Sequence, residues 1–143
     1  SVRMPDCNII NTFAEGVQLA KTVGLDNVKV LIDFYHMVCE KENPEVLRKY
    51  GKEYLRHVHF SYPSIPEIDG VRDPDNIRTI FEGELHRRSW WRTFPSCREE
   101  WDYTDFIQAL KDCGYQGRVS LEAPVTDFDR QAQEALAFMK AEF

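Results

Sequence analysis

Three residues of types that bind metal ions each lie at or near the end of an apolar run. Asp33 ends the most hydrophobic run of the chain, His59 stands near the end of a second, and Glu122 lies at the end of a third. An ionised group buried without a partner is strongly unfavourable. Asp33 therefore either lies at a solvated strand end or is held there for chemistry. Two carboxylates and one imidazole that converge on a point would suit a divalent cation.

The alternation of side chains between the two faces of a strand groups these three residues together. The predicted strands are residues 27–34, 55–61 and 117–123. Each has one apolar face, and the opposite face carries the ligand-type residue near the C-terminal end. The apolar pairs are Val30 and Ile32, Val58 and Phe60, and Val119 and Leu121. His57 lies one pleat below His59, and we interpret it as a structural residue.

Predicted helices alternate with these strands, which indicates an α/β fold of parallel strands covered by helices. The helices are expected at residues 8–24, 43–54, 102–115 and 127–143, with a long loop at 62–101. Strands of an open sheet are covered on both faces and are apolar throughout. Barrel strands instead carry polar groups at the top of their inner face. The pattern therefore favours a (βα) barrel, or a piece of one.

The composition indicates one soluble globular domain over residues 1–143, with 43% hydrophobic and 29% charged residues. A net charge of −6 argues against a nucleic-acid partner, whose binding surfaces are usually basic. No apolar run approaches the roughly 18–20 residues that a membrane span needs. The four cysteines are scattered without a CxxC pair, so we expect thiols in a reducing cytosol and a cytoplasmic protein.

Each candidate residue also has a structural interpretation. A single aspartate at a strand end is more often a turn or cap residue, and a single strand histidine is more often a hydrogen-bonded core residue. Together, however, three residues of metal-binding types lie on the same face and at the same end of their strands, and this favours a metal site over three separate structural roles. For Glu40, a solvated helix end and a substrate-side carboxylate are equally good interpretations. Three aromatic residues of the long loop could stack on a bound ligand, although we favour packing in a loop core for them; they are Trp90, Trp91 and Phe94.

At these residues the chain resembles the sugar isomerase/epimerase family, the xylose isomerase-like TIM barrels that include ketose 3-epimerases. The segment "LIDFYHMVCEKENP" is similar to the Asp-x-x-His-Met segment of the family, and "RHVHFS" to its His-x-His strand. The segment "DYTDFIQALKDCGYQGRVSLEAP" resembles the last helix and strand of such barrels. The resemblance covers the chain except for about residues 62–89.

The resemblance implies a function as a metal-dependent ketose isomerase or epimerase with a small sugar as its partner. Asp33, His59 and Glu122 would be metal ligands. The metal would be Mn²⁺ in the first place, with Co²⁺, Mg²⁺ or Zn²⁺ as alternatives. Such enzymes abstract a proton next to a carbonyl through a metal-bound enediolate, and Glu122 would also be one of the two catalytic carboxylates. His36 corresponds to the substrate-facing histidine. Arg92, in "RSWWRTFPS", is the candidate for a substrate-binding arginine of the family, displaced here by an insertion, and a solvated loop arginine is an equally good interpretation.

In the family, a further glutamate ends the strand before the helix at residues 8–24, and here it would fall just upstream of Ser1. We therefore expect the C-terminal part of a (βα)₈ TIM barrel, strands six to eight with covering helices. Alone, such a chain is expected to be inactive, to bind metal weakly or not at all because one ligand is absent, and to self-associate through uncovered sheet edges. The alternatives are an endonuclease IV-like metal phosphodiesterase, which needs more histidines than the four present, and a non-catalytic half-barrel for binding or assembly.

Overall fold

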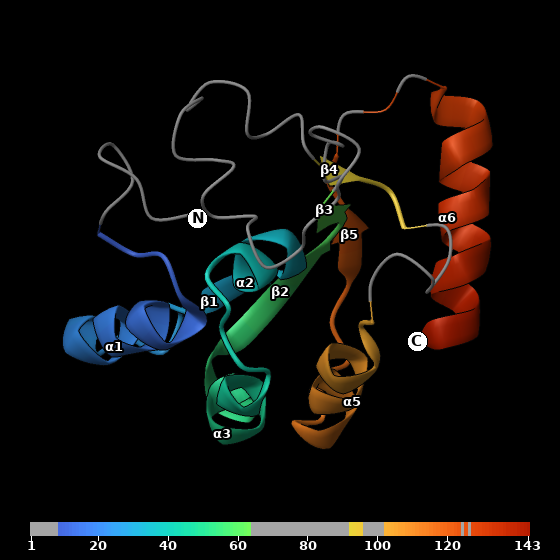
Figure 1. Ribbon diagram of the computed structural model, residues 1–143. Coiled ribbons are helices and arrows are strands. Elements are labelled where there is room, and N and C mark those ends of the chain that lie inside the picture. The colour runs from blue at the N-terminus through green and yellow to red at the C-terminus, as the bar shows by residue number, and fades with distance from the viewer. Residues whose placement is uncertain (1–8, 64–91, 96–101, 124, 126) are drawn as a thin grey trace.

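A parallel sheet of three strands forms the centre of the fold (Figure 1). The structure is a computed structural model that describes residues 9–63, 92–95, 102–123, 125 and 127–143. The strand order is β1 (Val30–Asp33), β2 (Leu55–Phe60) and β5 (Val119–Leu121), and both pairings are parallel. This arrangement confirms the predicted α/β fold and matches part of a TIM barrel.

Helices alternate with the strands of the sheet along the chain. The four longest described helices are α1 (Phe13–Val23), α3 (Glu45–Tyr54), α5 (Thr104–Asp112) and α6 (Phe128–Glu142). Helix α1 contacts β1, α3 contacts β2, and α3 also packs against α1 and α5. None of the helices in these described ranges combines the length and apolarity needed to cross a membrane.

The predicted alternation of the strands agrees with the burial of their side chains. Ile32, Val58 and Phe60 are buried in the core against the helices. Leu31 points to the opposite face with Asp33, and 45% of its surface is exposed. Asp33 is paired in register with His59, and Phe60 with Leu121, so the C-terminal ends of the three strands lie side by side.

Local sequence signals account for the helix boundaries. Helix α1 begins at Phe13, later than predicted, because Thr12 and Glu15 form a reciprocal capping box. Gly24 ends this helix with φ of 68°, a left-handed conformation that suits glycine. At the start of α3, the side chain of Asn43 accepts a hydrogen bond from the Glu45 amide at 2.8 Å, as a capping residue does.

The structure contains two features that the sequence analysis did not predict. The short helix α2 (Phe34–Cys39) follows β1 directly, and the Oδ1 atom of Asp33 accepts a hydrogen bond from the Tyr35 amide at 2.9 Å. Within the predicted loop at 62–101, β3 (Tyr62–Pro63) and β4 (Arg92–Thr93) form an antiparallel pair. This pairing returns the chain to the carboxyl end of β2.

Several residues singled out from the sequence lie outside the described ranges, namely Trp90, Trp91, Cys7 and Cys97. Phe94 is buried and its ring packs edge-on against Phe128, with ring centroids 6.4 Å apart. This packing agrees with the interpretation of Phe94 as loop core. Cys39 and Cys113 are buried thiols that form no disulfide within the described residues.

Candidate metal centre

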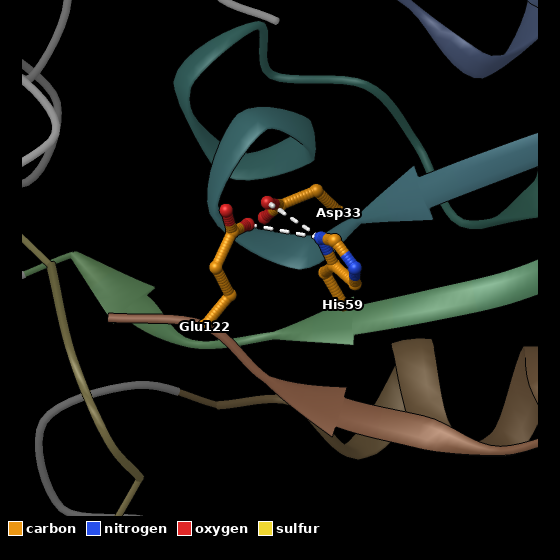
Figure 2. A group of neighbouring side chains, drawn as sticks. All are labelled: Asp33, His59 and Glu122. Atoms are coloured by element: carbon orange, nitrogen blue, oxygen red, sulfur yellow. Dashed lines mark hydrogen bonds and ion pairs between the residues drawn. The ribbon is translucent and has the colours of Figure 1, made fainter. Parts of the chain in front are cut away.

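Asp33, His59 and Glu122 converge at the carboxyl ends of the three parallel strands (Figure 2). The Nδ1 atom of His59 lies 2.9 Å from Oε2 of Glu122 and 4.0 Å from Oδ2 of Asp33. One potential ligand atom from each residue lies within 4.8 Å of the other two. The parallel register explains this convergence, because β1, β2 and β5 deliver their last inward-facing residues to the same edge.

The two carboxyl groups occupy different environments. The side chain of Asp33 is only 6% exposed, whereas that of Glu122 is 46% exposed. Burial raises the pKa of Asp33 to about 6, although the Arg92 guanidinium opposes this shift. For Glu122, the upward effect of burial on the pKa is outweighed by the Arg92 guanidinium, by the proton that Asp33 can share with it and by the contact with His59, so its pKa lies below the usual range. At neutral pH the site therefore holds two negative charges, and Asp33 is the first of the pair to gain a proton.

Arg92 donates to both carboxylates. Its Nη1 atom lies 3.1 Å from Oδ2 of Asp33 and 3.2 Å from Oε2 of Glu122. The side chain is 11% exposed, and the β3–β4 pairing brings it over the sheet end. The sequence analysis named Arg92 as a substrate-binding residue, and that role stays a prediction. A cation held between these carboxylates shows that the site attracts positive charge.

His36 lies beside this group on α2. Its Nε2 atom is 3.9 Å from Oδ2 of Asp33. Burial lowers the pKa of His36 to about 3, so the imidazole is neutral at physiological pH. Its Nδ1 atom is buried and has no hydrogen-bond partner within the described part of the chain. The ring can therefore take one further hydrogen bond.

A cavity of about 240 Å³ opens next to these residues. This volume is slightly below the range of about 300–1,000 Å³ that is typical of small-molecule sites. The polar side chains that line it include Asp33, His36, His59, Glu122, Asn11, Thr12 and Glu42. Glu40 ends α2 and is not among the lining residues, so its predicted substrate contact has no support from the cavity and stays a prediction.

Glu42 is a lining residue that the sequence analysis missed. Its carboxylate accepts hydrogen bonds from the amides of Phe13 and Ala14, at 2.8 and 3.1 Å, at the start of α1. A carboxylate is favourable there because the N-terminus of a helix is positively polarised. The partner amides lie 28 and 29 residues away in the sequence, so no local pattern could have identified this contact.

His57 belongs to the layer below the site, as its strand position predicted. Its Nε2 atom lies 3.0 Å from Oγ of Ser120, and its ring packs edge-on against that of His59 with centroids 5.1 Å apart. These contacts agree with a structural role for His57. They also limit how the His59 ring can turn.

The three side chains fit a divalent cation by the chemistry of their donor atoms. Two carboxylate oxygens and one imidazole nitrogen suit Mn²⁺, Co²⁺, Mg²⁺ or Zn²⁺, and the group contains no thiolate of the kind typical of structural zinc sites. The tight His59–Glu122 contact additionally fixes the orientation of the ring. The group can thus bind a cation and place a carboxylate beside a bound molecule.

Comparison with known proteins identifies several relatives. The family model described as xylose isomerase-like TIM barrel matches residues 2–142. A D-psicose 3-epimerase of Ruminiclostridium cellulolyticum is 30% identical over 114 residues, which are 80% of this chain and 29% of the relative. A D-psicose 3-epimerase of Agrobacterium fabrum is 42% identical over 53 residues, which are 36% of this chain and 18% of the relative.

A solved structure also resembles the fold of the chain. The crystal structure of D-psicose 3-epimerase from Clostridium cellulolyticum H10 with D-tagatose superposes with a TM-score of 0.67 at 26% identity. The match covers 99% of this chain and 47% of that structure. The chain therefore spans less than half the length of these relatives.

Proposed function

The chain belongs to the xylose isomerase-like TIM barrel family, as its motifs predicted, and from this premise we propose that it carries part of the active site of a metal-dependent sugar epimerase or isomerase. The proposed substrate is a ketose such as D-psicose, because the curated relatives are D-psicose 3-epimerases. The proposed metal is Mn²⁺ in the first place.

One observation carries the proposal, namely the convergence of Asp33, His59 and Glu122 at the carboxyl ends of three adjacent parallel strands. This edge is where TIM-barrel enzymes place their active sites. The cavity beside the three residues adds a place for a small polar molecule. If the three residues lay at the amino ends of the strands instead, their position would not indicate an active site.

The proposed roles follow from the environment of each side chain. Asp33, His59 and Glu122 would hold the metal ion, which would supply a Lewis acid that polarises a sugar carbonyl. Glu122 is a carboxylate at neutral pH, so it could accept a proton from the carbon next to that carbonyl. His36 lines the cavity as a neutral imidazole, so its ring could exchange a hydrogen bond with a sugar hydroxyl and orient it.

Metal binding is the first test of this function. Calorimetric titration with Mn²⁺, made on the chain and on the longest available form of the protein, should show at least about tenfold weaker binding by Glu122→Gln, which loses a charged ligand, than by the unsubstituted protein. Glu134→Gln, at an exposed position on α6, removes the same charge away from the strand ends and should leave the affinity unchanged. Equal affinities for all three proteins would rule out Glu122 as a ligand.

Proton exchange is the second test and separates the proposed chemistry from the alternatives. In D₂O with Mn²⁺, an epimerase exchanges the hydrogen on the carbon next to the carbonyl of D-psicose, and ¹H NMR detects the loss of that signal. A phosphodiesterase would cleave phosphodiesters and leave the sugar signal intact. Since the chain spans less than half of its relatives, the measurement should be made on the chain and on the longest available form of the protein.

A further inference from the structure

We propose that Arg92 is a built-in competitor of the metal ion, so that a divalent cation binds Asp33 and Glu122 only when the guanidinium leaves them. The inference rests on the proposed function, because it concerns the same candidate metal centre. It adds a role for Arg92 that differs from substrate contact.

The argument begins with the atoms that Arg92 uses. Its Nη1 donates to Oδ2 of Asp33 and Oε2 of Glu122. These are the oxygens that face the Nδ1 atom of His59, at 4.0 and 2.9 Å. A metal ion coordinated by the three residues would use this space and these lone pairs. The guanidinium and the metal ion therefore exclude one another.

Charge leads to the same conclusion. Arginine keeps its positive charge in proteins, so it cannot yield to the metal by losing a proton. A divalent cation placed next to the guanidinium would repel it, and repulsion is strong where little water enters, as at the 11% exposed side chain of Arg92. Movement of the side chain is the remaining way to relieve this repulsion.

The contacts of Arg92 are consistent with a displaceable group. Its Nε atom is buried without a hydrogen-bond partner within the described residues, so the guanidinium is not fully satisfied where it lies. The side chain comes from the two-residue strand β4, whose described pairing is with the equally short β3. The ring of Tyr35, with its centroid 5.3 Å from the guanidinium carbon, offers a second surface that attracts a cation.

The test compares Mn²⁺ affinity and thermal stability in Arg92→Met. The methionine keeps an unbranched chain but removes the charge and the donors. We expect Mn²⁺ to bind at least about tenfold more tightly, since no charge-assisted hydrogen bonds have to be broken first. In EDTA, we expect Tm to fall by roughly 2–4 °C because the buried Asp33 loses its counter-charge, and saturating Mn²⁺ should remove this difference.

A matched control and a second variant make the result interpretable. Arg130→Met, on the exposed surface of α6, removes an arginine that also pairs with two carboxylates, and it should leave Mn²⁺ affinity unchanged. Arg92→Lys keeps the charge but loses the planar fork, so its affinity should lie between those of the wild type and Arg92→Met. If circular dichroism shows that Arg92→Met is unfolded, the Mn²⁺ affinity of Arg92→Lys relative to the wild type tests the competition.

The possible outcomes separate this inference from the proposed function. Tighter binding by Arg92→Met, or binding by Arg92→Met where the wild type binds none, supports the competition. Equal or weaker binding by the Arg92 variants, or an unchanged Tm in EDTA, overturns the competition and leaves the metal centre standing. Absence of Mn²⁺ binding in every protein, both as the chain and in the longest available form, overturns both.

Discussion

At the scale of single residues, Asp33 combines a structural and a chemical task through its two oxygens. Oδ1 accepts the Tyr35 amide at the start of α2, and Oδ2 faces Arg92 and His59. The hydrogen bond to the helix fixes the orientation of the carboxylate, so Oδ2 is presented to the site without a further ordering step. This division suggests a substitution that separates the two tasks.

Asp33→Asn should retain the helix start but lose metal binding. The amide oxygen can still accept the Tyr35 amide, while the NH₂ group replaces Oδ2 and removes the negative charge. We expect Mn²⁺ affinity to fall by at least about tenfold, with unchanged helix content in the far-ultraviolet circular dichroism. Full Mn²⁺ affinity in the folded variant would mean that Asp33 is a helix cap and nothing more.

The raised pKa of Asp33 predicts how metal affinity depends on pH. A metal ion needs the carboxylate, and burial raises the pKa of Asp33 to about 6. Below this value a proton must be released before the metal binds, so the affinity should fall by about tenfold between pH 7 and pH 5. Above pH 7 the contribution of Asp33 should be constant.

Titration calorimetry at several pH values checks this dependence. Asp33→Asn provides the control, because the asparagine side chain does not titrate in this range. The curve of the variant should be flatter between pH 5 and pH 7. Parallel curves for the two proteins would contradict a titration of Asp33 in this range.

At the scale of elements, α3 approaches the end of α5 closely. A Cβ atom added at Gly51, in α3, would lie 2.7 Å from Sγ and 3.0 Å from Cβ of Cys113. Alanine improves helix propensity by about 0.5–1 kcal/mol, but overpacking in a core typically costs about 1–3 kcal/mol. We therefore expect Gly51→Ala to lower the free energy of unfolding by about 1 kcal/mol in urea denaturation.

Removing the obstructing sulfur should rescue part of this loss. Cys113→Ala by itself leaves a small cavity and is destabilising. Combined with Gly51→Ala, the added methyl group fills part of that cavity, so the double variant should be more stable than the sum of the two single effects. If the changes in the free energy of unfolding were strictly additive, the side chains at positions 51 and 113 would not be in steric conflict.

The sequence predicted the strands and their ligand-bearing faces because alternation within a strand is a local property. The apolar pair Val58 and Phe60 identifies the buried face of β2, and His59 must then point the other way. The position of Arg92 was beyond such reasoning. It depends on the pairing of β3 with β4, which are separated by 28 residues in the chain. Helix α2 was also missed, because its aromatic residues Phe34 and Tyr35 fit the continuation of a strand.

At the scale of the whole molecule, the described sheet has three strands in the order β1–β2–β5, whereas a closed TIM barrel has eight. Within the described ranges, β1 and β5 each pair with β2 alone. Unpaired strand edges present hydrogen-bonding groups to other chains. The inner face adds apolar surface, since Leu31 of β1 is 45% exposed.

These edges and this face lead us to expect that the 143-residue chain self-associates in solution. Sedimentation velocity should show an average mass that rises with concentration, because association through open edges follows mass action.

Leu31→Lys places a charge on the inner face of the edge strand and should shift the equilibrium toward the monomer. Leu19→Lys is the matched control, since Leu19 is 47% exposed on α1, away from that face, and it should associate like the wild type. A monodisperse monomer at every concentration, or the same mass for all three proteins, would mean that the open edges and Leu31 do not drive contacts between chains.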